Sequence, residues 1–127
     1  MLFLGMVTCW FIACKPKETV PEIKEPLDAG RVFVDATLKG DFETSERYII
    51  HDEKNEKAIA AFKAYYKELP ANIKTETAVR SWKIEKLEEI NETTSLITFS
   101  HEMFKQPITI GIHKKDNTWL IDFSQFH

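Results

Sequence analysis

Residues 94–123 read TSLITFSHEMFKQPITIGIHKKDNTWLIDF, and apolar and polar side chains alternate along most of this segment. A period of two is typical of a β-strand with one buried face. The alternation predicts three strands, over residues 94–103, 108–112 and 118–123. Turn-forming residues at 114–117 separate the last two. Strands joined by such short connections predict an antiparallel meander.

A fourth strand is predicted upstream, over Val79–Glu89 (VRSWKIEKLEE). Trp82 and Ile84 fall on one face of it, and the alternation slips before Leu87, which predicts a bulge or bend. Asn91-Glu92 predicts the turn into the next strand. The segment therefore completes a four-stranded antiparallel sheet.

Before Pro70 the hydrophobic period is that of helices. One helix is predicted from Leu27 to Gly40, a short second one over Phe42–Ile49 with Asp41 as its N-cap, and a third over Asp52–Leu69. Helices followed by strands predict an α+β fold, with N-terminal helices packed on the four-stranded sheet. The apolar stripe of the third helix comprises Ile59, Phe62, Tyr66 and Leu69.

The first 26 residues have a different composition. Met1–Ala13 carries no charged side chain, is too short to span a bilayer and fits the apolar core of a secretory leader. The next residue is Cys14, and Phe11-Ile12-Ala13-Cys14 resembles a bacterial lipobox. We therefore expect residues 1–13 to be a lipoprotein signal peptide and Cys14 to be acylated. The proline-rich, charged residues 14–26 predict a flexible tether. The alternative is an apolar first element packed into the core.

Two further stretches carry a resemblance. Residues 29–42 (AGRVFVDATLKGDF) form an apolar helix broken by Gly-Asp-Phe, and residues 117–123 (NTWLIDF) lead from a polar turn into a closing strand. Both resemble the nuclear transport factor 2-like (cystatin-like) superfamily over residues 27–127. Together with the lipobox, the chain is similar to lipoproteins of unknown function from Bacteroidetes-type bacteria. The resemblance implies that the sheet is curved around the helices as a cone.

The charge balance argues against nucleic acid as a partner, because the formal net charge is −3 and the pI is near 5.8. No phosphate-binding loop, nucleophile elbow or zinc-ligand spacing occurs, so we expect no cofactor and no metal. If the cone encloses a pocket, its predicted lining is Tyr48, Tyr66, Trp82, Phe99, His101 and Trp119.

His101 is the most informative of these residues, since it shares an apolar strand face with Ile97 and Phe99. It could serve as a base or anchor a ligand, but such a histidine is more often satisfied by a backbone carbonyl. His113 is expected to face solvent. Asp52 begins a polar helix and is more simply its cap than a catalytic group.

Three functions follow from these observations. The first is a non-catalytic lipoprotein, held by its lipid at a membrane surface of the cell envelope (the periplasmic or outer-membrane face), that binds a small apolar ligand or a protein partner. The second is an isomerase- or dehydratase-like enzyme with His101 or Asp52 as base and Tyr48 or Tyr66 as oxyanion donor, as the resemblance implies. The third is a homodimeric interaction module that pairs through the open face of the sheet.

Overall fold

The computed structural model describes residues 22–125, which form four helices, a four-stranded sheet and a closing 3₁₀ turn. The predicted leader, Cys14 and most of the tether lie outside these residues and stay predictions. The elements are α1 (Pro26–Leu38), α2 (Phe42–Arg47), α3 (Glu53–Lys67), α4 (Ala71–Val79), β1 (Trp82–Asn91), β2 (Thr94–His101), β3 (Ile108–Lys115), β4 (Thr118–Asp122) and η1 (Phe123–Gln125).

The sheet is the predicted meander, antiparallel throughout and ordered β1-β2-β3-β4. Ile97 of β2 lies opposite Ile110 of β3, so the apolar positions of neighbouring strands share the inner face. The register of β1 shifts between Ile84 and Lys86, which confirms the slip expected from the sequence. Asp116-Asn117 closes the last hairpin with positive φ angles, a conformation that Asp and Asn adopt more readily than most residues.

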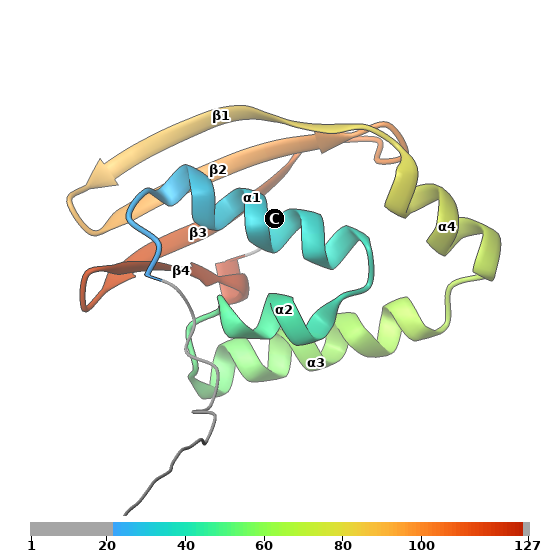
Figure 1. Cartoon of the computed structure of the whole chain (residues 1–127), viewed down its shortest axis with the longest axis horizontal. Coiled ribbons are helices and arrows are strands. Elements are labelled where there is room, and N and C mark those ends of the chain that lie inside the picture. The colour runs from blue at the N-terminus through green and yellow to red at the C-terminus, as the bar shows by residue number, and fades with distance from the viewer. Residues whose placement is uncertain (1–21, 126–127) are drawn as a thin grey trace, which may run out of the picture.

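Helix α1 packs on the inner face of the sheet against β2, β3 and β4 (Figure 1). Its buried Phe33 and Val34 belong to one core with the inward side chains of these strands. Burying a side chain such as Phe33 stabilises the fold by about 2–3 kcal/mol. The close approach needs Gly30, because a Cβ at this position would lie 2.5 Å from Cδ1 of Ile97.

Helices α2 and α3 begin at the predicted N-caps. The Asp41 carboxylate accepts a hydrogen bond from Thr44 N–H, and that of Asp52 accepts one from Asn55 N–H. The segment between α2 and α3 then runs parallel to β4 and covers its outer edge, since Ile50 N–H donates to the Ile121 carbonyl at 2.9 Å. This bridge fixes where α3 starts relative to the sheet.

Helix α4 was not predicted. Pro70 was interpreted only as the end of α3, but it also forms the N-cap of α4. The predicted start of the first strand at Val79 is therefore wrong: Val79 ends α4 with 75% of its surface exposed, and β1 begins at Trp82. No residue of α4 is fully buried, so this helix lies on the domain rather than within its core.

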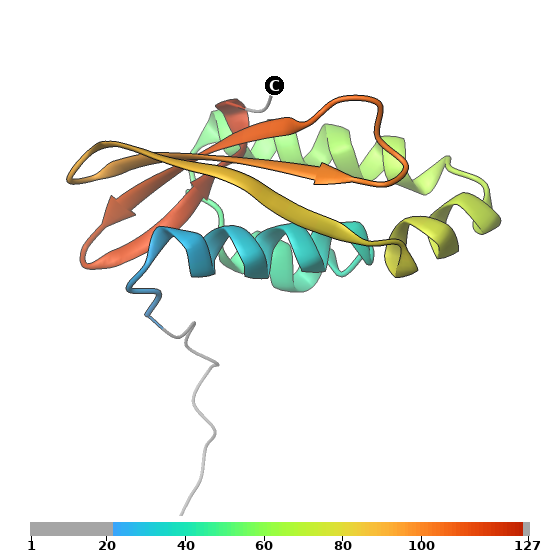
Figure 2. The same ribbon diagram turned by 90° about the horizontal axis from the view of Figure 1, so that it is seen from above.

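The two ends of the molecule differ in their elements. In both views α4 and the β2–β3 loop lie at one end, while the start of α1 and the β1–β2 and β3–β4 turns lie at the other (Figures 1 and 2). We call these the mouth end and the hairpin end. The chain enters at the hairpin end, where Ile23 exchanges hydrogen bonds with Thr118 and Trp119. Among the described helices, none is both long and apolar enough to cross a membrane.

Candidate functional site

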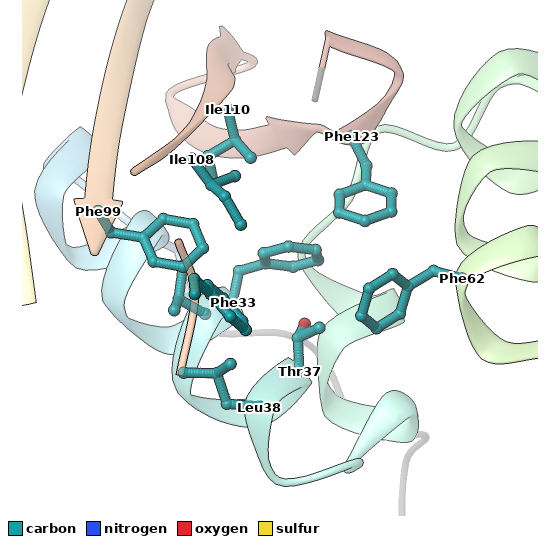
Figure 3. A pocket seen from close by; sticks show the side chains of 10 residues that line it. Phe33, Thr37, Leu38, Phe62, Phe99, Ile108, Ile110 and Phe123 are labelled. Carbon is teal, nitrogen blue, oxygen red and sulfur yellow. The ribbon is translucent and has the colours of Figure 1, made fainter. Parts of the chain in front are cut away.

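A small apolar cavity of about 40 Å³ lies between α1, α3 and the sheet. Phe62 and Phe123 meet edge to face in its wall, with ring centroids 5.8 Å apart, and Phe33 packs against Phe123 (Figure 3). The hydroxyl of Thr37 is already bonded to Ser45 Oγ at 2.8 Å, so the cavity offers water no free polar partner and should stay dry. The lining residues are Phe33, Val34, Thr37, Leu38, Phe62, Phe99, Phe104, Ile108, Ile110 and Phe123.

A wider groove of about 490 Å³ adjoins this cavity at the mouth end. Its volume is within the range of sites that hold small ligands. Cavity and groove share five lining residues, so the groove leads towards the apolar interior. Its walls come from the end of α1, the second half of α3, α4 and the β2–β3 loop. The lining residues are Thr37, Leu38, Phe62, Tyr65, Tyr66, Leu69, Ile73, Thr77, Met103, Phe104 and Ile108.

Few polar groups face this groove, and the two threonine hydroxyls among them are engaged. The Thr77 hydroxyl donates to the Ile73 carbonyl at 2.7 Å, one turn back in α4. The Tyr66 ring packs edge to face on Phe42, with the ring centroids 5.3 Å apart. The Lys74 ammonium lies over the Tyr66 ring, 5.2 Å from its centroid. A ligand in the groove would therefore meet mainly aromatic and aliphatic surface.

His101 holds two walls of the groove together. Its imidazole is 4% exposed, and Nδ1 accepts a hydrogen bond from Met103 N–H at 3.0 Å. Nε2 lies 3.0 Å from the Thr77 carbonyl oxygen, so this nitrogen carries the proton and donates it. The side chain thus ties α4 to the β2–β3 loop. His101 therefore matches the interpretation in which backbone groups satisfy the histidine. Neither ring nitrogen is left to bind a substrate.

The six residues proposed for a pocket lie in different places. Tyr66 lines the groove, and Phe99 lines the small apolar cavity. Trp82 and His101 are a cross-strand pair beside a separate shallow hollow over the start of β1. Tyr48 is half-buried and Trp119 is buried in the core, and neither touches the cavity or the groove.

The catalytic set considered from the sequence is not assembled. Asp52 precedes α3 and Tyr66 lies near its other end, about 21 Å away at 1.5 Å per residue. Hydrogen bonds from the backbone N–H and side-chain amide of Asn55 lower the pKa of the Asp52 carboxyl, as expected of a helix cap. The exposed His51 lies 3.9 Å from Glu56 at the surface. These groups do not converge on one cavity.

A buried polar cluster lies at the start of α3. Asn55 is 1% exposed, and its amide donates to Asp52 at 3.0 Å and to Asp122 at 3.2 Å. Its carbonyl oxygen accepts the N–H groups of Phe123 and Ser124. The cluster therefore joins α3 to the end of β4 and to η1.

The second Asp122 oxygen lies 3.2 Å from Nε2 of His113, without the alignment of a hydrogen bond. His113 was expected to face solvent, and it does lie on the outer face of the sheet, but this nitrogen is buried against the carboxylate. The cavity and groove do not touch this pair. Within residues 22–125, no group of three or more His, Cys, Asp or Glu is placed to hold a metal ion.

Several groove residues were missed because α4 was not predicted and because the strand predicted over residues 94–103 ends at His101, two residues earlier than expected. Ile73 and Thr77 belong to α4, and Met103 and Phe104 lie in the β2–β3 loop. One signal was available: Met103-Phe104 is an apolar pair in a connection that otherwise needs only polar residues.

The comparisons bear on the fold. No protein-family model and no curated protein matches the chain. A solved structure does, described as an NTF-2 like protein of unknown function from Shewanella oneidensis MR-1. The two chains are 14% identical with a TM-score of 0.52, over 75% of this chain and 89% of that one. A likeness of this degree shows a shared fold and does not show a shared activity. The predicted helices on a curved antiparallel sheet are thus confirmed, and the described domain has the nuclear transport factor 2-like fold.

Proposed function

We propose that this domain binds a small apolar ligand in the groove at its mouth end. The observation that carries the proposal is the continuity of the groove with the small apolar cavity, through the shared Phe62, Phe104 and Ile108. Transfer of an apolar ligand from water onto this surface is favourable by about 25 cal/mol per Å² of buried apolar area. The role is non-catalytic binding, since both ring nitrogens of His101 are committed to structural bonds and Asp52 caps the far end of α3.

We further propose that Cys14 carries a lipid that holds the domain at a membrane surface of the cell envelope. The support is the uncharged leader and the lipobox-like Phe11-Ile12-Ala13-Cys14. Two or more acyl chains on one cysteine anchor a protein stably. The domain is entered at its hairpin end, through Ile23. An anchor attached there would leave the groove, at the mouth end, facing away from its own attachment point.

Binding can be tested by titrating the purified protein with 1-decanol and measuring affinity by NMR. Ile73→Trp places a larger ring in the groove and should lower the affinity at least tenfold. Val79→Trp is the matched control, because this side chain belongs to the same helix but is outside the groove and 75% exposed. Equal affinity in both variants, or no binding by the unmodified protein, would contradict the proposal.

Acylation can be tested separately by growing bacteria that express the chain with radiolabelled palmitate. The label should enter the protein, remain in Cys9→Ser and disappear in Cys14→Ser. Cys9 is the appropriate control because it is the only other cysteine in the sequence. Label that persists in Cys14→Ser, or that never enters the protein, would exclude a lipid at this position.

A further inference from the structure

We propose that the ligand is an amphiphile with one aliphatic chain and an anionic head, and that Lys74 binds the head at the rim of the groove. This inference rests on the proposed function and names its ligand class. The apolar floor of the groove selects the chain, as described above. The head group is inferred from the Lys74 ammonium, which lies over the ring of the groove-lining Tyr66.

Lys74 is the cation that the fold holds against the groove wall. Its ammonium lies 5.2 Å from the centroid of the Tyr66 ring, and Tyr66 lines the groove. The side chain is only partly exposed, and one N–H donates to the carbonyl of Lys67 at 3.2 Å. The ammonium is thus positioned by a helix end and an aromatic ring instead of moving freely in solvent.

This ammonium has capacity for an anion. A lysine ammonium has three donors, and the Lys67 carbonyl occupies one of them. In the described part of the chain no carboxylate lies within ion-pair distance of Lys74, whereas Lys39, Lys57 and Lys63 each have such a partner. A carboxylate arriving in the groove could therefore pair with Lys74 without displacing an existing partner.

Nearby acidic groups do not cancel this charge. Glu76, in the same helix, and Glu102, in the β2–β3 loop, both pair with Arg80, at 2.8 Å and 3.4 Å. The hydrogen bonds that Arg80 donates to these two carboxylates raise the pKa of its guanidinium, so Arg80 remains charged between them. The ion pairs of Arg80 with Glu76 and Glu102 do not include Lys74. Lys74 therefore remains a positive group next to Tyr66 in the groove wall.

The test compares decanoate with 1-decanol, which share a ten-carbon chain and differ in charge. Lys74→Gln should weaken decanoate binding by about three- to fivefold and leave decanol binding unchanged. Raising the salt concentration should reduce the preference of the unmodified protein for decanoate. Lys105→Gln is the control, since it removes the same charge from the exposed loop beside Phe104.

The outcomes separate this inference from the proposed function. If Lys74→Gln weakens decanol as much as decanoate, Lys74 has only a structural role and the inference is wrong. Equal losses of decanoate affinity in Lys74→Gln and Lys105→Gln would also overturn it, because the effect would come from net charge. If decanol binds and decanoate binds no better, the groove remains a ligand site but the anionic head is excluded. If neither probe binds, both proposals fail.

Discussion

The two ends of α3 are built in opposite ways. Where the helix begins, the buried Asn55 bonds to Asp52, to Asp122 and to two backbone N–H groups. Where it ends, Tyr66 borders a groove of about 490 Å³ whose lining is mainly apolar. One end fastens the helix to the sheet through buried polar groups, and the other borders an apolar groove.

This difference assigns stability and binding to separate parts of one element. A satisfied buried network fixes a single arrangement of the groups that it joins. The groove is bordered by α4, which has no fully buried residue and is attached through contacts such as His101 Nε2 to the Thr77 carbonyl. Regions with few buried contacts open most easily, which suits a ligand entrance. The same helix can thus be firm at its start and accessible at its end.

The largest expected effect comes from breaking the polar end. Asn55→Leu removes the hydrogen bonds that Asn55 makes with Asp122 and with the Phe123 and Ser124 N–H groups, and losing a buried polar partner costs about 1–3 kcal/mol. Asp122 keeps its bonds from Ser124. We expect the free energy of unfolding to fall by about 3 kcal/mol or more in urea denaturation. Asn72→Leu, at an exposed position of α4, should change it by no more than about 0.5 kcal/mol. A loss below about 1 kcal/mol for Asn55→Leu would show that the cluster is dispensable.

His101→Phe tests how α4 and the β2–β3 loop are held together at the mouth end. The ring keeps its apolar packing on Phe104, but the Met103 N–H and the Thr77 carbonyl lose their partner. We expect a loss of about 2 kcal/mol, together with faster hydrogen exchange in α4 than in β2. The control is His51→Phe, which alters an exposed surface histidine. Unchanged exchange in α4 would mean that His101 does not hold the groove walls together.

Gly40→Ala tests the turn that supports the Tyr66 side of the groove. Gly40 has φ of +77°, and a Cβ there would meet the Tyr66 hydroxyl oxygen at 2.5 Å. The positive φ and the close contact both disfavour alanine, so we expect the free energy of unfolding to fall by about 1–2 kcal/mol. In a Tyr66→Phe background the contact with the oxygen is absent, and the same substitution should cost less. Equal losses in both backgrounds would show that the hydroxyl oxygen contributes nothing, and would leave the φ angle and the ring contacts with Cζ at 2.8 Å and Cε1 at 3.0 Å as the cause.

The smallest effect concerns the charge of Asp52. Its pKa lies below the ordinary value of 3.8 because Asn55 donates hydrogen bonds to the ionised carboxylate. The stabilisation is therefore complete well above pH 3.8 and is lost as the pH falls through the lowered pKa of the folded state. Asp52→Asn keeps a helix cap but removes this titration. The stability difference between the two proteins should shrink as the solution is acidified, and a constant difference down to pH 2 would contradict this account.

The sheet could be predicted from the sequence because its inner positions alternate strictly, as at Ile108, Ile110 and Ile112. The bulge in β1 could be predicted because the same alternation slips before Leu87. Helix α4 could not be predicted, since ANIKTETAV has one large apolar side chain before its last residue and several β-branched residues that favour helices weakly. The helix is stabilised instead by contacts made after folding, such as the bond from His101 to its backbone.

The site was predictable only in part for a related reason. Tyr66 and Phe99 have a periodicity that marks them as inward-facing, and both border the cavity or the groove. Trp119 has the same pattern, but its side chain is buried in the core. Periodicity tells which face of an element is apolar, but whether that face meets another element or an open space depends on the tertiary arrangement.

The most direct test of the account is a map of backbone amide chemical shifts as 1-decanol is added to the protein. Saturable changes are predicted around Phe62, Ile73 and Phe104, with the amides of Asn55 and Asp122 unaffected. Changes centred on Asn55 and Asp122, or none at the groove, would contradict the assignment of ligand binding to the mouth end.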